Sequence, residues 1–351
     1  MSIFKDIKRC KRCIMPENYP GIKLNEEGVC NLCLSHKARN GNPDKNKLVT
    51  LVKSFKENNR YDCIVPLSGG KESTYVLYYA VEELGLKPLA VNYDSGFQNK
   101  LAAENMSRSC RVLNVPLVTK RANQVIQKNL LREAIKISNT AGTFFHICGN
   151  CEVALRAVSM SVAREYKIPV VLWGSSSEED ISSYSDKHMG KKAFMRRMSA
   201  RKIFKILPHI AKYSFISIKQ RIELKIPLRY AINPIGPLPF PESKPKFVHF
   251  FDYILYDYQR QAELIKDKLG WKHPEDKDFR FDCALHCFGN YSSTKLTNIS
   301  SDGIIYCNYI RNNMMNRAEA LEREKNLDEA MIHECKEIIH KLGISGIEIL
   351  E

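Results

Sequence analysis

The segment PLSGGKES combines residue types that can bind the phosphates of a nucleotide. Gly69 and Gly70 let the backbone turn sharply and bring its N–H groups close to an anion. Ser68 and Ser73 add hydroxyl donors, and Lys71 adds a positive charge. The segment joins an expected strand to an expected helix, whose N-terminus adds its dipole and its unsatisfied donors. We therefore predict a phosphate-binding loop here rather than an ordinary strand–turn–helix junction.

This loop is of a distinct type. The common GxxxxGK[ST] loop needs a glycine at position 65, which is Val65 in this chain. The segment resembles instead the PP-loop of ATP pyrophosphatases, which hold the β- and γ-phosphates as a leaving pyrophosphate and pass AMP to the substrate. In that resemblance Glu72 stands where an aspartate is usual, so a carboxylate is kept but its reach toward Mg²⁺ is altered.

Two further strand ends carry polar groups that could contact a nucleotide. Asp94 ends the strand in VNYDSGF, where a carboxylate can bind Mg²⁺ or an adenosine hydroxyl. An acidic residue at a strand end is also a common turn former, and of the two interpretations we favour the functional one. Gly174 and Ser175 end a later strand with closely spaced donors. Lys71 and Asp94 are thus the expected catalytic residues, in an ATP site that also includes the loop, Gly174 and Ser175.

Four cysteines near the N-terminus have the spacing of a zinc site. Cys10 and Cys13 form one CxxC pair, and Cys30 and Cys33 form a second pair sixteen residues later. Four thiolates leave no open position for water, so the ion should stabilise the fold of this module rather than catalyse a reaction.

A second set of cysteines predicts another metal site less directly. Cys148 and Cys151 begin an expected helix, and Cys283 and Cys287 lie far down the chain. If the later pair folds back to the carboxyl edge of the sheet, three or four thiolates meet beside the ATP site. Zinc and an iron–sulfur cluster both accept such ligands, and free thiols are the alternative.

The elements that position these residues alternate between strands and helices. Apolar runs predict strands at 61–67, 88–94, 116–119 and 169–174, with helical patterns between them, of which the first spans 73–85 and ends at Gly85. Further helical patterns at about 246–269 and 317–342 follow a proline-rich connector at 233–245. This alternation predicts an α/β fold with a doubly wound parallel sheet, in which ligands bind beyond the carboxyl ends of the strands. We expect four parts: a zinc module (1–40), a PP-loop domain (41–185), a basic helical insertion (186–232) and a mostly helical substrate or partner region (233–351).

The positive charge is concentrated in one place. The chain has a formal net charge of +15, and residues 187–229 hold a dense set of Lys and Arg interleaved with Phe, Ile and Met at helical spacing. This pattern suits a membrane surface or a partner groove at least as well as a nucleic acid, which we do not expect as a partner. A solvated basic helix is the plainer interpretation. With no apolar signal core and no long apolar run, we expect a cytoplasmic protein, peripheral at the inner membrane.

Several segments together resemble the N-acetyl sugar amidotransferases of lipopolysaccharide and O-antigen biosynthesis. The resemblance runs in order through nearly the whole chain, in CKRCIMPENYPGIKLNEEGVCNLC, PLSGGKEST, HICGNCE, WGSSSEE, LGWKHPEDKDFRFDC and IRNNMMNRAEALE. It implies an ATP-dependent enzyme that adenylates the acetamido oxygen of a nucleotide-linked N-acetyl sugar and lets ammonia displace AMP. It also implies Mg²⁺ as a cofactor beside Zn²⁺, and a partner glutaminase with a cyclase-like companion.

Two other functions use the same residues. A PP-loop sulfur transferase that modifies tRNA would also combine cysteine knuckles, extra cysteines and a basic surface. A zinc-bearing nucleic-acid-binding module without catalysis would explain the cysteines and the charge, but it leaves the phosphate loop without a role.

Overall fold

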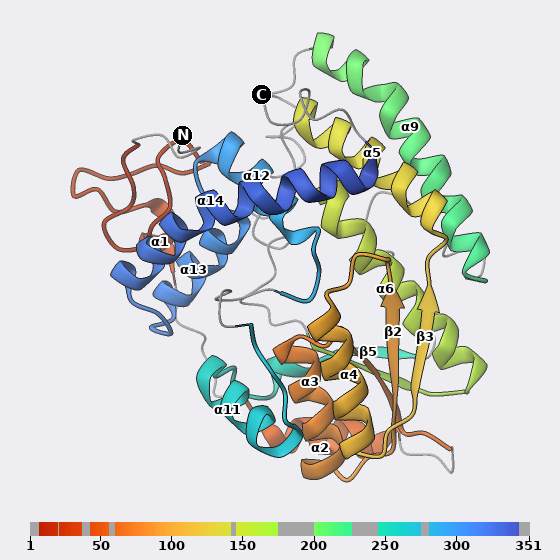
Figure 1. The fold of residues 1–351 in the computed structure, drawn as a ribbon. Coiled ribbons are helices and arrows are strands. Elements are labelled where there is room, and N and C mark those ends of the chain that lie inside the picture. Colours follow the sequence, from red (N-terminus) through yellow and green to blue (C-terminus); the bar gives the residue numbers. More distant parts are fainter. Residues whose placement is uncertain are drawn as a thin grey trace.

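The computed structural model describes residues 7–19, 21–36, 43–55, 60–141, 145–174, 200–226, 245–274 and 281–343. A parallel β-sheet forms its framework, and helices pack around the sheet (Figure 1). Of the predicted connector at 233–245, only Pro245 lies within the described residues, and residues 187–199 and 227–229 of the basic stretch lie outside them.

Five parallel strands form the sheet, in the order β3-β2-β1-β4-β5. Four of them lie within two residues of their predicted bounds at each end, and the fifth, β5, was not predicted. The strands are β1 (Cys63–Pro66), β2 (Pro88–Asp94), β3 (Leu117–Arg121), β4 (Val170–Trp173) and β5 (Lys246–His249).

The prediction of a helix over 246–269 is wrong at its start. Residues 246–249 pair with β4 in parallel, and the helix α11 begins only at Tyr258 (Tyr258–Leu269). A short run of aromatic and β-branched residues suits either element, and a partner strand distant in sequence decides between them.

Side chains alternate between the two faces of the sheet, and each face packs against its own helices. On one face Cys63 packs with α3 (Lys71–Tyr78) and α4 (Lys100–Val112). On the other face Ile64 packs with α6 (Phe145–Glu165). Helices therefore cover both faces, as the alternating pattern predicts.

The order of the strands reverses between β1 and β4. Ile64 of β1 pairs with Val171 of β4, while the chain has already placed β2 and β3 on the opposite side of β1. Such a reversal opens a crevice for ligands at the carboxyl ends of the strands in parallel α/β sheets. The predicted phosphate loop lies at this point.

Helix α3 continues into a single π-helical turn, η1 (Tyr79–Glu83), and the chain then turns at Gly85 with φ +59°. The predicted end of this helix at Gly85 is confirmed. The remaining helices of the N-terminal half are α1 (Asn31–Ser35), α2 (Lys45–Ser54) and α5 (Gln124–Ala141).

The C-terminal helices lie in two places. Helix α11 packs against α3 and α4, whereas α12 (His286–Thr297), α13 (Ser301–Arg311) and α14 (Arg317–Leu342) pack together. Figure 1 shows α13 and α14 in blue beside the N-terminal module in red, so that segments far apart in the sequence lie side by side.

Helix α9 (Ala200–Glu223) lies along α5 at the edge of the molecule (Figure 1). Its inner face buries Ile206 and Tyr213, and its outer face exposes Phe204 by 77% and Phe215 by 71%. The predicted amphipathic helix is thus present over 200–223, but its outer face is also apolar. In the described part of the chain no helix meets the length and apolarity that crossing a bilayer requires.

Candidate active site and metal centre

The phosphate loop has a backbone that only glycine can adopt. Strand β1 ends at Pro66, and Gly69 then takes a left-handed φ of +85°. A Cβ on Gly69 would lie 2.0 Å from the carbonyl oxygen of Ala102 in α4. Any side chain at this position would force the loop away from α4, so the tight turn depends on this glycine.

Two serine hydroxyls hold the turn from inside. The Oγ atoms of Ser68 and Ser73 lie 3.2 Å apart, and Ser68 Oγ accepts a hydrogen bond of 3.3 Å from the N–H of Gly70. Gly70 is the N-cap of α3 and brings no capping side chain to it. The N-terminus of α3, with its dipole and backbone donors, therefore opens onto the loop, as an anion site requires.

The amine of Lys71 is directed into a small aromatic cage. Its Nζ lies 2.6 Å from Glu72 Oε1, donates to Tyr256 Oη at 2.8 Å, and stands 4.0 Å from the ring centroid of Tyr258. Only 4% of the side chain is exposed. The charge predicted for the phosphates is thus paired with Glu72 in this structure.

Glu72 is correspondingly fixed as a carboxylate. Burial alone would raise its pKa, but the charge and hydrogen bond of Lys71 and a hydrogen bond from Tyr256 lower the pKa of Glu72 to about 2. Tyr256 Oη also lies 2.9 Å from Tyr309 Oη of α13. This network joins the start of α3 to two distant segments, and its tyrosines were not predicted as site residues.

Asp94 lies at the carboxyl end of β2, as predicted, but both of its oxygens have partners. Oδ1 accepts from the N–H of Gly96 at 2.7 Å, and Oδ2 accepts from Arg121 Nε at 2.8 Å. The first bond closes an Asx turn, which is the turn-forming interpretation of this residue. Its proposed role at the nucleotide would require the exposed Arg121 to exchange partners.

A segment far along the chain closes over the loop. Trp271 Nε1 donates to the carbonyl of Gly69 at 3.0 Å, and Gln98 Nε2 donates to the carbonyl of Ser68 at 2.9 Å. Asp282 Oδ2 lies 3.4 Å from the position that a Cβ on Gly70 would take. These three residues were missed, although Trp271 and Asp282 belong to the segment LGWKHPEDKDFRFDC, which sequence analysis singled out.

Main-chain hydrogen bonds hold this segment against the loop that follows β2. The N–H of Asn99 donates to the carbonyl of Asp282 at 3.0 Å, and the N–H of Ala284 donates to the carbonyl of Phe97 at 2.9 Å. Gln98 and Cys283 form the antiparallel bridge between them. The late cysteine segment therefore lies beside the loop that follows β2 at the carboxyl edge of the sheet, which is the condition that the hypothesis of a second metal site required.

Gly174 ends β4 directly beside the start of α3. A Cβ on Gly174 would lie 3.5 Å from Ser73 Cα, an ordinary van der Waals distance, so the end of β4 lies within contact range of the start of α3. The loop and Gly174 are thus brought together as predicted, while Ser175 lies outside the described residues.

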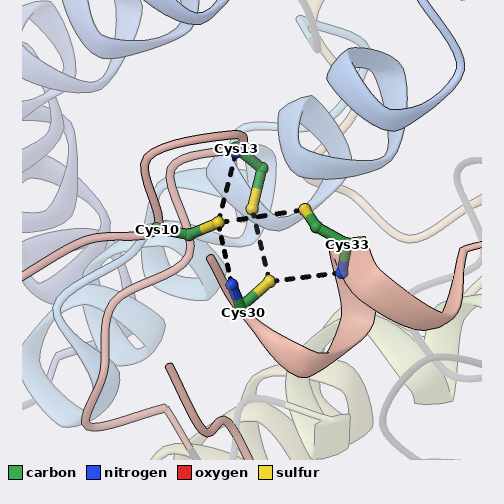
Figure 2. Close-up of side chains that lie close together, drawn as sticks. All are labelled: Cys10, Cys13, Cys30 and Cys33. Atoms are coloured by element: carbon green, nitrogen blue, oxygen red, sulfur yellow. Dashed lines mark hydrogen bonds between the residues drawn. The ribbon is translucent and has the colours of Figure 1, made fainter. Parts of the chain in front are cut away.

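The four N-terminal cysteines converge on one buried point (Figure 2). The Sγ atoms of Cys10 and Cys33 lie 3.9 Å apart, and those of Cys13 and Cys30 lie 3.8 Å apart. Four sulfurs in a tetrahedron around zinc at about 2.3 Å are separated by about 3.8 Å. Backbone N–H groups also donate to these sulfurs, as in the 3.2 Å bond from the N–H of Cys30 to Cys10 Sγ. The geometry and the donor set fit a closed structural zinc site.

The module docks on the C-terminal helices through arginines. Arg317 Nε of α14 donates to the carbonyl of Cys13 at 2.9 Å, and the buried Arg311 of α13 lies 3.8 Å from Cys13 Sγ. A guanidinium beside a cluster of thiolates offsets their negative charge. The metal centre is therefore coupled to residues 301–317 rather than only to its own knuckles.

The second predicted cysteine site remains a prediction. Cys283 lies beside Gln98, whereas the buried Cys287 donates to the carbonyl of Ala284 at 3.2 Å and lies beside Cys335. Among the residues whose side chains are described, only the N-terminal cysteines converge as a group of three or more candidate ligands. Cys148 and Cys151 both lie in α6, but the side chain of Cys148 is outside the described part of the structure.

The chain has little detectable sequence similarity to known proteins. No protein-family model matches the chain, and no curated protein matches it. Among solved structures the chain is similar to the NMN synthetase from Francisella tularensis, with 16% identity and a TM-score of 0.31, over 83% of this chain and 93% of that chain. At this TM-score the likeness carries no argument about the reaction.

Proposed function

We propose that the chain is an ATP pyrophosphatase, an enzyme that binds the β- and γ-phosphates of ATP at residues 68–73 and forms AMP. The observation that carries this proposal is the turn at Gly69, where φ is +85° and any Cβ would meet Ala102. A strained turn that excludes all side chains, placed where the strand order reverses and at a helix N-terminus, is what a backbone cradle for phosphates requires.

The reaction follows from where the outer phosphates are held. With these two phosphates fixed, the bond that breaks joins the α-phosphorus to the bridging oxygen, and pyrophosphate leaves. The growing negative charge is met by the N-terminus of α3 and by Lys71 once a phosphate replaces Glu72 as its partner. Mg²⁺ bound with the nucleotide would offset part of the same charge.

The acceptor we propose is the acetamido group of a nucleotide-linked N-acetyl sugar. Its carbonyl oxygen attacks the α-phosphorus and forms an imidate ester of AMP. Ammonia then adds to the imidate carbon, the carbon–oxygen bond breaks, and AMP leaves with that oxygen to give an acetamidino group. An amide oxygen is a poor leaving group and AMP is a good one, so no protein nucleophile is needed. The segments that resemble N-acetyl sugar amidotransferases support this acceptor.

The ammonia would come from a separate glutaminase with a cyclase-like companion. We propose this because ammonia is mostly protonated at neutral pH and a partner can deliver it unprotonated. The same resemblance supports the glutaminase.

One incubation tests the proposal. The protein is supplied with ATP, ammonium and UDP-linked acetamido sugars, and the products are separated by chromatography and mass spectrometry. AMP, pyrophosphate and an acetamidino sugar should form in equal amounts, and omission of the sugar should stop all three. Release of ADP and phosphate with the accepted sugar would contradict the proposal. Loss of a thiolated nucleoside from the RNA of a deletion strain would favour the tRNA sulfur transferase instead.

We also propose that α9 contacts an anionic membrane surface. Phe204, Leu207, Phe215 and Ile222 share the outer face of this helix and are 51% to 77% exposed. Arg201, Lys205 and Lys219 lie along one edge of that stripe and are exposed. An apolar stripe beside a row of cations matches the boundary between anionic headgroups and acyl chains.

A further inference from the structure

Two carboxylates lie beside the phosphate loop, and they differ in whether a cation is paired with them. Glu72 Oε1 accepts hydrogen bonds from Lys71 and Tyr256 and is therefore neutralised by a neighbouring cation. Asp282 also lies at the loop, with Oδ2 3.4 Å from the position of a Cβ on Gly70. In the described part of the chain no hydrogen-bond donor or cation contacts the carboxylate of Asp282.

The position of Asp282 is fixed by the main chain. Its carbonyl accepts from the N–H of Asn99, and the next residue but one, Ala284, donates to Phe97. Trp271, from the same stretch of chain, donates to the carbonyl of Gly69. The carboxylate is therefore held beside the loop by contacts that do not involve its own oxygens.

A bare carboxylate beside a phosphate cradle opposes the binding of a phosphate. Like charges close together repel, and the repulsion is strong where water is partly excluded. A divalent cation between the two anions reverses the sign of the interaction. Mg²⁺ accompanies nucleotide phosphates, prefers carboxylate oxygens and keeps one or two protein carboxylates as ligands.

We propose that Asp282 is the protein ligand of the Mg²⁺ that binds with the nucleotide, and that Glu72 instead serves to hold Lys71. The proposal rests on the proposed function, because it needs a nucleotide at residues 68–73. It assigns the metal to the C-terminal half of the chain and the phosphates to the loop. Both halves are then needed to bind the magnesium nucleotide.

Binding of a non-hydrolysable nucleotide tests this without turnover. The affinity of α,β-methylene ATP is measured by calorimetry with and without Mg²⁺, for the wild type, for Asp282→Asn and for Asp267→Asn. Asp267 is a matched control, because it is an exposed acid on α11 whose nearest cation is its neighbour Lys268. Asp282→Glu, which keeps the charge, is the conservative variant, and thermal melts check that each protein is folded.

We expect Mg²⁺ to reverse the order in which the wild type and Asp282→Asn bind the analogue. Without Mg²⁺, Asp282→Asn should bind the analogue more tightly than the wild type, since the repulsion is gone. With Mg²⁺, it should bind at least about tenfold more weakly, as is typical when a metal site loses a supporting group. Asp267→Asn should behave as the wild type, and Asp282→Glu should keep a dependence on Mg²⁺.

Two other outcomes would overturn the assignment in distinguishable ways. If Asp282→Asn keeps the full dependence on Mg²⁺, the metal ligand lies elsewhere and the proposed function stands. If the wild-type protein binds no analogue in either condition, the proposed function fails, and the role of Asp282 fails with it.

Discussion

Replacing Gly69 by alanine should slow the reaction strongly while leaving the protein folded. Built on the present backbone, the new Cβ would lie 2.0 Å from the carbonyl oxygen of Ala102, whereas real Cβ atoms stay beyond 3.0 Å. The loop and α4 must therefore separate by about 1 Å, and a displacement of that size at a reacting centre costs on the order of 100-fold in rate. Such a loss corresponds to about 2.7 kcal/mol of transition-state stabilisation.

Gly85 offers a matched control for this substitution. It also has a positive φ, +59°, but a Cβ built there meets nothing within 4 Å. Both alanine variants should lose about 1–2 kcal/mol of folding stability through the left-handed backbone, and Gly69→Ala should lose more because its Cβ also meets Ala102; urea unfolding measures both losses. Only Gly69→Ala should lose the release of AMP and pyrophosphate in the assay with ATP, ammonium and an acetamido sugar.

Two results would refute this reasoning. Wild-type turnover by Gly69→Ala would mean that the tight approach to α4 does not position the phosphates. An equal loss of turnover in Gly85→Ala would mean that activity follows global stability, and the turn at Gly69 would then have no special part in catalysis.

Three further predictions concern the metal centre, a buried acid and α9. Cys30→Ser should lower both the zinc content and the free energy of unfolding, whereas Cys63→Ser, at a thiol equally buried in β1, should keep the zinc; metal analysis after gel filtration separates the two. Burial raises the pKa of Glu324 to about 7 against an ordinary value of 4.5, so between these values the native state binds a proton that the unfolded chain has released. Stability should fall as the pH rises through this window, by up to about 3 kcal/mol, and urea midpoints on either side of it should differ less in Glu324→Gln. Phe204→Ser combined with Phe215→Ser should reduce sedimentation with anionic vesicles and leave turnover of a water-soluble sugar unchanged; undiminished sedimentation would contradict the assignment of that surface.

Local features of the site could be predicted from the sequence. The zinc centre depends on two CxxC pairs, whose spacing sets the geometry of each knuckle whatever the remainder of the fold does. The turn at residues 68–73 depends on two glycines between a buried strand and a helix, which is again a local pattern. The loop and Gly174 meet because parallel strands bring their carboxyl ends to one edge of the sheet.

The features that were missed depend on contacts distant in sequence. Asp282 is held at the loop by the pairing of residues 282–284 with residues 97–99, and Trp271 lies between two residues whose carbonyls accept hydrogen bonds from α4. No local pattern records either set of contacts. The tyrosine partners of Lys71 were missed for the same reason, because Tyr256 lies just before α11 and Tyr258 begins that helix, both far from Lys71 in sequence. The residue type of Lys71 predicts a cation at the loop, but the groups that contact its amine depend on how distant segments pack.

The contact between the cysteine module and α14 bears on the order in which the protein matures. The ribosome releases residues 10–33 long before residues 301–342, so all four thiolates are available to a metal before the arginine that binds their carbonyls has been synthesised. Docking must therefore be one of the last steps of folding. A chain that ends before Ser301 should still load its ion and yet leave the knuckles undocked, a species that proteases would distinguish from the finished protein.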